Sequence, residues 1–203
     1  MPPNPLTDAI VFLTKGDYLA ANHARFVSLY WLLLAGALLA ALLVWWREPA
    51  QRSGGALGIL CLRVLTGTMW WQQSLWKIPP HYAGLVYWMK QEAAHAAVPL
   101  QGALVRNFVL PHIAGFGPLV YAFEVAIGVS LILGLFTRLG AFMGILMAVN
   151  LWLGLYSAPG EWPWTYFFLV IIMMLFFIDP PGRVLGFDGL WHRAGARGAS
   201  LLA

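Results

Sequence analysis

A few polar side chains lie inside long apolar stretches of this sequence, where ionisable groups are costly and usually functional. Glu124 lies in the middle of one such stretch, and Arg63 lies part-way into another. At 1.5 Å per residue, Glu124, Trp70 and Asn150 fall in one layer, about 17 to 21 Å from the expected inner ends of their helices. We therefore expect Glu124 to accept hydrogen bonds from Trp70 and Asn150, or to be protonated, since burial disfavours a charged carboxylate.

Such a layer could form a small polar cavity in which a carboxyl group exchanges protons with a ligand. Glu124 is the candidate catalytic group, and the candidate polar cavity consists of Arg63, Trp70, Gln73 and Asn150. Alternatively, these groups only hold the helices in register through hydrogen bonds. A direct salt bridge between Arg63 and Glu124 is left open, because Arg63 is shallower and leans towards the inner end of its helix.

A second group of candidates could attract an anion at the outer surface. It lies in and beside segment 79–112 and consists of Lys77, His81, Lys90, His95 and Arg106. Positive charge gathered on one surface concentrates anions there. For Lys77 alone, an ordinary charged side chain reaching from a helix end to the interface explains its position equally well.

The sequence predicts no metal site and no tightly bound redox cofactor. Cys61 is the only cysteine, so an internal disulfide, a thiolate cluster and a Cys-x-x-Cys-His haem attachment are excluded. No histidine lies mid-span, which argues against a bis-histidine haem in the bilayer. His112, at the mouth of an apolar stretch, remains a candidate axial ligand for a pigment or haem.

Membrane-spanning helices have to position these residues. Of 203 residues, 61% are apolar and 10% are charged, whereas soluble domains carry about 25% charged residues. A soluble enzyme is therefore excluded, and the lipid bilayer is the expected partner. The net charge of +4 is spread along the chain, which argues against nucleic-acid binding. Five stretches have the length and composition of spans: 26–46, 56–78, 114–136, 139–156 and 162–178.

These spans predict an all-α integral membrane protein. Residues 1–25 form an N-terminal segment with an interfacial helix over 5–24, and residues 26–46 form an additional transmembrane helix. Residues 56–192 form a four-helix domain that contains the loop 79–112, and residues 193–203 form a tail. Within the loop, residues 82–97 form either an interfacial helix or an ordinary covered loop.

Two polar stripes predict which spans meet. In span 56–78, Arg63, Gly67, Trp70, Ser74 and Lys77 share one helix face. In span 114–136, a similar stripe includes Gly117, Glu124 and Gly128. Because glycine allows helices to approach closely, we expect these two faces to pack together.

The distribution of arginine predicts the orientation. Five spans place the termini on opposite sides, and six arginines lie on the side that holds the C-terminus: Arg47, Arg52, Arg138, Arg183, Arg193 and Arg197. The positive-inside rule then makes the C-terminus cytoplasmic, with the N-terminus and loop 79–112 periplasmic, in a prokaryotic cytoplasmic membrane.

Four segments resemble those of one membrane-protein family, the DoxX/DoxD family. The first carries Leu-Arg-Val-Leu-Thr-Gly and ends in Trp-Lys-Ile-Pro, and the second combines Phe-Glu-Val with Gly-Leu-Phe-Thr-Arg-Leu. The other two are Glu-Trp-Pro-Trp-Thr-Tyr and Gly-Arg-Val-Leu-Gly-Phe-Asp. These segments occupy 62–79, 123–139, 161–166 and 182–188. The last two are similar more narrowly to the DoxD branch, and the likeness covers about residues 56–192.

The resemblance implies a DoxX-like four-helix transmembrane bundle with one extra N-terminal helix. It also implies a small membrane subunit of a thiosulfate:quinone oxidoreductase, in which electrons from thiosulfate pass to quinone. Under this implication, quinone is the expected ligand and the polar cavity around Glu124 is its expected site. A soluble DoxA-type partner completes that enzyme, so this chain is not expected to be a self-sufficient enzyme. Alternatively, the extra helix indicates a non-catalytic accessory subunit, bound to other subunits of a respiratory or photosynthetic membrane complex. A transporter is disfavoured, since no inverted repeat is visible.

Overall fold

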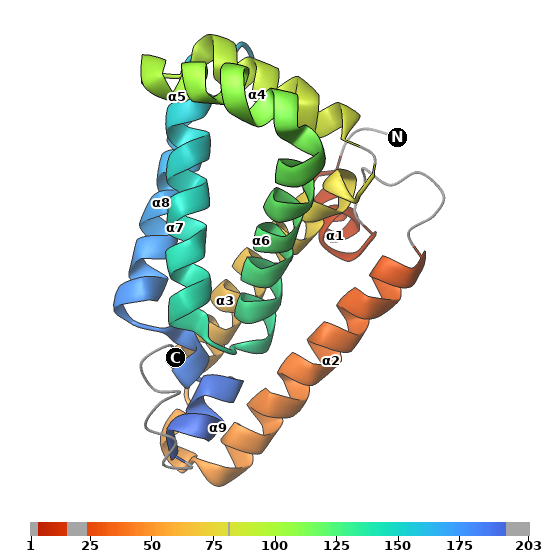
Figure 1. The fold of residues 1–203 in the computed structure, drawn as a ribbon. Coiled ribbons are helices and arrows are strands. Elements are labelled where there is room, and N and C mark those ends of the chain that lie inside the picture. The colour runs from red at the N-terminus through yellow and green to blue at the C-terminus, as the bar shows by residue number, and fades with distance from the viewer. Residues whose placement is uncertain (1–3, 16–23, 81, 194–203) are drawn as a thin grey trace.

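The structure, a computed structural model, describes residues 4–15, 24–80 and 82–193, and its regular elements in these ranges are all helical (Figure 1). The predicted interfacial helix at 5–24 is seen as α1 (Pro5–Lys15), and residues 16–23 lie outside the described ranges. The same holds for His81 and, beyond Arg193, for the predicted tail.

Four long helices form the bundle: α3 (Gly54–Ser74), α6 (Ile113–Leu133), α7 (Thr137–Gly154) and α8 (Pro163–Ile178). Helix α3 packs on α6, α6 on α7, and α7 on α8. The predicted spans coincide with these helices within a few residues. Helix α6 ends before the expected Phe136, because Gly134 takes the left-handed conformation and stops it (φ 71°).

The two predicted polar stripes do meet in the α3–α6 contact. A Cβ atom on Gly67 would lie 2.8 Å from the backbone nitrogen of Ile132, and one on Gly128 would lie 2.9 Å from that of Trp71. These distances are shorter than any side chain tolerates. The two glycines therefore set the separation of α3 and α6.

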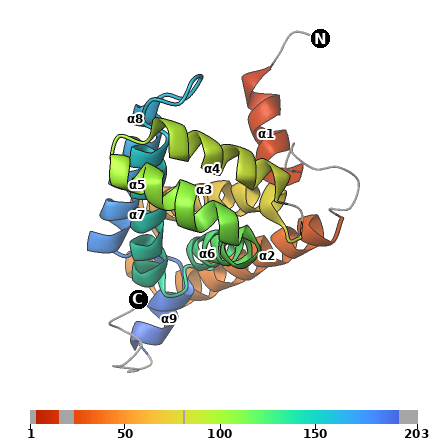
Figure 2. The ribbon, with the colours of Figure 1, turned by 45° about the horizontal axis from the view of Figure 1, so that its top comes forward.

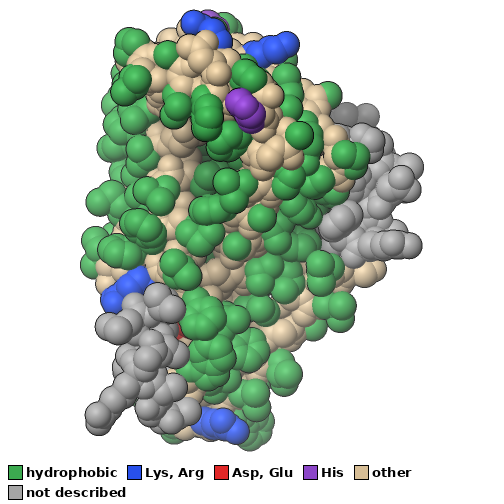
Figure 3. Space-filling model, viewed as in Figure 1, with side chains coloured by type: hydrophobic (Ala, Val, Ile, Leu, Met, Phe, Trp, Pro, Cys, Tyr) green, Lys and Arg blue, Asp and Glu red, His purple; other side chains and the backbone are tan. Residues whose placement is uncertain are grey.

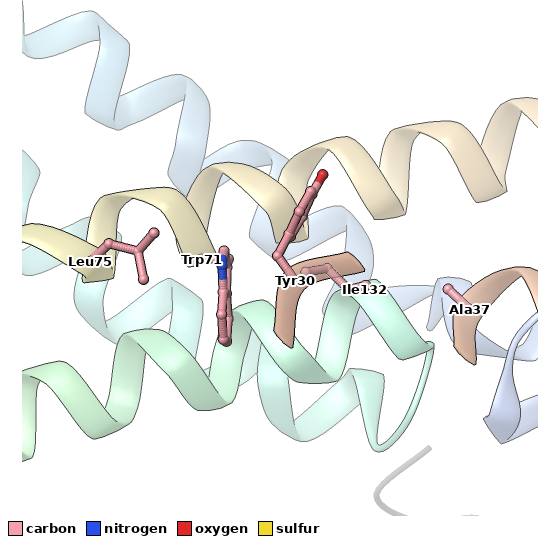
Figure 4. Packing of buried hydrophobic residues seen from close by; sticks show 5 residues of the cluster. All are labelled: Tyr30, Ala37, Trp71, Leu75 and Ile132. Carbon is pink, nitrogen blue, oxygen red and sulfur yellow. The ribbon is translucent and has the colours of Figure 1, made fainter. Parts of the chain in front are cut away.

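The additional helix α2 (Ala24–Arg47) runs obliquely beside α3 and α6 (Figures 1 and 2). It buries Tyr30 and Ala37 against Trp71, Leu75 and Ile132, and Figure 4 shows these side chains between neighbouring helices. Trp71 belongs to α3, Leu75 to the 3-10 turn that follows it (Leu75–Lys77), and Ile132 to α6. The Tyr30 hydroxyl lies 3.1 Å from Thr68 Oγ1. One face of α2 is therefore fixed to the bundle.

Segment 79–112 is helical over most of its length, which corrects the prediction of a long loop. Residues 82–97 are helical over α4 (Ala83–His95), as the interfacial-helix interpretation requires. Helix α5 (Pro99–Leu104), a π-helical turn (Val105–Val109) and a 3-10 turn (Leu110–His112) then continue without interruption into α6. Figures 1 and 2 show α4 and α5 lying across one end of the bundle. We call residues 83–112 the cap, and this end of the bundle the cap end.

The opposite end of the bundle, the tail end, carries the C-terminal elements. These are a 3-10 turn (Pro181–Arg183) and α9 (Phe187–Arg193), which packs beside the end of α2 (Figure 1). The connection between α2 and α3 also lies at this end and includes a short 3-10 helix, Pro49–Gln51. All the connections at the tail end are short.

The outer surface suits a bilayer. Three described segments are long and apolar enough to cross a membrane, 28–47, 99–133 and 137–154, and α8 is a shorter apolar helix. Figure 3 shows hydrophobic side chains over the sides of the bundle, with Lys and Arg side chains at its two ends. This distribution is typical of a multi-pass membrane protein.

Candidate functional site

A buried ion pair lies beneath the cap. Lys77 Nζ is 2.5 Å from Glu124 Oε1 and 2.6 Å from Oε2, and both side chains are almost fully buried. The ammonium group also lies 4.4 Å from the ring centroid of Trp76. In low-dielectric surroundings a lone charge at either position would be strongly disfavoured, so each side chain compensates part of the other's loss of hydration.

This pair contradicts two expectations from the sequence. Glu124 bonds neither Trp70 nor Asn150, and Lys77 does not belong to an outer anion-attracting surface. The physical reason is that side chains lean towards the N-terminus of their own helix. Because α3 and α6 run in opposite directions, Lys77 leans towards the tail end and Glu124 leans towards the cap end. The two side chains therefore meet, although their backbones lie at different depths in the bundle.

A second buried carboxylate accompanies the pair. Glu92 projects from α4 and is 7% exposed, and Asn150 Nδ2 approaches its two carboxylate oxygens at 3.5 Å. Gln101 Nε2 donates to the Asn150 carbonyl and to its Oδ1 atom, both at 3.0 Å. Asn150 itself is exposed on α7. The cap thus brings Glu92 and Gln101 against the end of α7 that lies at the cap end of the bundle.

Burial brings the titration of Glu92 close to neutral pH. Burial raises the pKa of Glu92 to about 7, although the hydrogen bond from Asn150 and the charge of Lys77 lower it. Two carboxylates and one ammonium group therefore share this region. The cluster can hold or release one proton close to physiological pH.

Glu92 was not among the candidate residues proposed from the sequence. Its spacing from the apolar Leu85 and Met89, seven and three residues, is the signal that could have identified it. These three residues and Ala93 are the buried face of α4. Gln101 lay within the predicted loop and carried no such signal.

Glycine creates room for the cluster on α7. A Cβ atom on Gly154 would lie 3.0 Å from Glu92 Cγ and 3.0 Å from Gln101 Nε2. Both polar side chains therefore lie directly against the α7 backbone. A larger residue at this position would push the cap away from the bundle.

The remaining members of the predicted cavity lie apart from the pair. Trp70 Nε1 points at Met173 Sδ on α8, 3.3 Å away, and Gln73 accepts a hydrogen bond of 3.2 Å from Trp76 Nε1. Arg63 is fully buried towards the tail end. The four residues proposed as one cavity therefore occupy different parts of the bundle.

Arg63 belongs to a structural cluster that we call the latch, which consists of Arg63, Gly134, Thr137 and Asp188. Arg63 Nη1 donates to the carbonyls of Leu131 (2.7 Å) and Ile132 (3.0 Å) at the end of α6, and Nη2 donates to that of Leu185 (3.2 Å). The guanidinium thus satisfies carbonyls that the end of the helix leaves without partners.

Asp188 supplies the other half of the latch. Its carboxylate accepts hydrogen bonds from the backbone N–H groups of Phe136 (2.6 Å) and Thr137 (2.9 Å) and from Thr137 Oγ1 (2.6 Å). The backbone N–H of Asp188 donates to the Gly134 carbonyl at 2.8 Å. A fully buried carboxylate at the start of α7 complements the helix dipole.

Three of the predicted anion-attracting residues lie on the cap. Lys90 and Arg106 are exposed, and His95 is half-buried. Arg106 Nη2 donates to the Ala93 carbonyl at 2.6 Å, which ties the π-helical turn to α4. Part of this positive charge is thus used in holding the cap together.

The chemistry available at the cap end is that of proton transfer. Among the described residues, no three His, Cys, Asp or Glu side chains are grouped so that they could hold a metal ion. The buried Lys77–Glu124 pair and Glu92 instead combine ionisable groups with restricted access. Together they define a helical membrane protein with a buried group of ionisable side chains at one end of its bundle.

Comparison with known proteins agrees with this class. The family model of DoxX matches residues 58–178, so the chain belongs to the DoxX family. The match begins in α3 and ends with α8, which confirms a DoxX four-helix membrane bundle with α2 as an additional helix. No curated protein matches the chain, and neither does any solved structure.

Proposed function

We propose that the protein is the membrane subunit of a quinone-linked electron-transfer system, with thiosulfate:quinone oxidoreductase chemistry. The observation that carries the proposal is the buried Lys77–Glu124 pair with Glu92 beside it. Reduction of a quinone to a quinol takes up two electrons and two protons. The chain supplies a path for protons, and a partner subunit of the DoxA type supplies the redox centre.

The residues at the cap end fit a quinone head group as substrate. Its carbonyl oxygens need hydrogen-bond donors, and the exposed Asn150 amide lies where α7 meets the cap. Glu92 is buried directly behind that amide. A head group that reaches Asn150 from the bilayer would therefore have Glu92 as a proton donor, separated from it only by the Asn150 side chain.

Thiosulfate would approach from the other side of the cap. Exposed Lys90 and Arg106 give the outer surface positive charge, which favours an anion there. This division places the anion in water and the quinone in lipid, as their solubilities require. It also supports a periplasmic cap and a cytoplasmic C-terminus in a prokaryotic cytoplasmic membrane.

Quinone reduction in isolated membranes tests the proposal. Membranes from cells with and without the protein are supplied with thiosulfate and a short-chain quinone, and quinol formation is followed by absorbance. We expect the rate to depend on the protein and to fall about 100-fold in Glu124→Gln. Cys61→Ser changes an exposed residue and is the matched control. Equal rates with and without the protein would exclude the proposal.

A non-catalytic accessory role is the second candidate, and helix α2 supports it. This helix lies outside the family match and exposes large apolar side chains along its length: Leu29, Trp31, Leu32, Leu38, Leu39, Leu42, Leu43 and Trp46. A neighbouring subunit could cover this face. A native gel in mild detergent tests the role, because migration of the chain alone would contradict it.

A further inference from the structure

The side chain of Gln101 holds Asn150 at two points. Gln101 Nε2 lies 3.0 Å from the Asn150 carbonyl oxygen and 3.0 Å from Asn150 Oδ1. Gln101 belongs to α5 on the cap, and Asn150 belongs to α7 in the bundle. A single amide side chain of the cap therefore contacts both the main chain and the side chain of Asn150.

These contacts determine which way both amide groups face. A backbone carbonyl oxygen only accepts hydrogen bonds, so the Gln101 atom beside it is the donor Nε2. An amide nitrogen does not accept, so the Asn150 atom that faces Nε2 is the acceptor Oδ1. The Nδ2 atom of Asn150 is then left on the side of Glu92, where it lies 3.5 Å from both carboxylate oxygens.

The three side chains meet over one turn of α7. Gly154 follows Asn150 by one turn, and a Cβ atom on it would lie 3.0 Å from Gln101 Nε2 and 3.1 Å from Glu92 Cδ. Glu92 is buried and Gln101 is half-buried. Because both side chains lie against the α7 backbone, the Gln101 amide has little room to turn away from Asn150.

Two titratable side chains from other elements interact electrostatically with Glu92. Lys77 lies in the 3-10 turn after α3, and Tyr166, which donates a hydrogen bond to Glu161, lies on α8. Among the described residues, the Gln101 side chain makes its hydrogen bonds to Asn150 alone. A change at Gln101 therefore leaves the charges around Glu92 in place and alters the Asn150 amide.

We propose that Gln101 is a positioning residue that orients the Asn150 amide, so that its Nδ2 group donates both to Glu92 and to a ligand. Nδ2 carries two hydrogens. One is directed at the Glu92 carboxylate, and the other is left for an acceptor atom at the exposed side of Asn150. The carbonyl oxygens of an oxidised quinone are such acceptors. The ligand half of this inference rests on the proposed function, whereas the orientation of the amide does not.

A titration of Glu92 tests the orientation in the absence of quinone. Infrared spectra of the purified full-length chain in detergent are recorded over about 2 pH units on either side of the Glu92 pKa of about 7. The carboxyl band that Glu92→Gln removes is assigned to Glu92. Without Gln101, the Asn150 amide can turn its oxygen towards Glu92, which favours the protonated carboxyl group. We expect Gln101→Met, which has a similar length and no amide, to raise the midpoint by about 1 pH unit.

A double variant distinguishes action through Asn150 from a direct effect of Gln101. Asn150→Ala should raise the midpoint by a similar amount, and adding Gln101→Met to it should cause no further change. Asn107→Ala removes an exposed amide from the same continuous helix and should leave the midpoint unchanged. An unchanged midpoint in either single variant, or additive shifts in the double variant, would overturn the proposal.

Binding of a short-chain quinone tests the ligand half separately. The wild type should bind the oxidised quinone about fivefold more tightly than Gln101→Met does, since the variant no longer orients the donor. Asn107→Ala should bind it as the wild type does. Equal binding by wild type and Gln101→Met would overturn the ligand half. A wild-type protein that binds no quinone would contradict that half together with the proposed function, and the titration would still decide the orientation of the amide.

Discussion

Lys77 and Glu124 stabilise one another because, in the part of the chain that the structure describes, each side chain makes its hydrogen bonds to the other alone. Replacing Lys77 by Met leaves a buried carboxylate alone, which should cost about 3 to 5 kcal/mol of unfolding free energy if that carboxylate stays charged. The double variant Lys77→Met with Glu124→Leu removes both charges and should recover most of this loss. Thermal unfolding of the wild type, Lys77→Met, Glu124→Leu and the double variant in one detergent measures the coupling free energy between the two side chains. Additive effects would show that the two side chains do not interact.

Glu92 should make stability depend on pH. Its pKa is about 7 in the folded protein, against an ordinary value of about 4.3. Between these values the folded state binds more protons than the unfolded state, so stability falls as pH rises. The change amounts to about 3 kcal/mol, and Glu92→Gln should remove it.

Melting temperatures at pH 5 and pH 8 provide the measurement for Glu92. The wild-type protein should lose more stability between these pH values than the variant does. Glu161→Gln alters another carboxyl group at the cap end, which accepts a hydrogen bond from Tyr166, and serves as the comparison. Parallel pH curves for wild type and Glu92→Gln would contradict the expectation.

At the scale of elements, the sequence predicted the five spans because apolar length and Pro or Gly at their ends determine them directly. It did not predict the continuous helix through residues 99–133. Pro111 and the polar residues before it are typical of a loop, and the π-helical turn at 105–109 lets the chain bend without breaking its helix. The packing of α3 on α6 was predictable, since Gly67 and Gly128 mark it.

The candidate site was harder to predict than the fold. Glu124 was correctly identified as an intramembrane carboxyl group, but its partner depends on side-chain direction as well as on depth. Arg63 and Asp188 illustrate a second difficulty. Both are buried and charged, and their partners are mainly backbone groups at helix ends, which residue types do not reveal.

The latch should control how the C-terminal segment attaches to the bundle. A Cβ atom on Gly182 would lie 2.7 Å from the Gly134 carbonyl oxygen, so Gly182→Ala should force the segment away and cost about 1 to 3 kcal/mol. Gly54→Ala is the control, since its Cβ atom would meet nothing within 4 Å. Limited proteolysis after residue 178 reads out the detachment, and equal cleavage of the two variants would contradict it.

At the scale of the whole molecule, the charges at the two ends predict an orientation. In a Cys61→Ser background, Lys90→Cys reports on the cap end and Gly54→Cys on the tail end. A membrane-impermeant maleimide added to intact cells should label position 90 and leave position 54 unlabelled. After the membrane is permeabilised, both positions should react. Labelling of position 54 alone in intact cells would reverse the orientation.

The uninterrupted helix from Pro99 to Leu133 makes the cap inseparable from the bundle. A hinged lid could swing aside and leave the core unchanged, but here α5 and Glu124 belong to a single bent rod. If a partner protein bound to α5 and displaced it, α6 would have to tilt or rotate with it, because the two helices are continuous. Removing the cap would likewise shorten a transmembrane helix and uncover the charged pair beneath it.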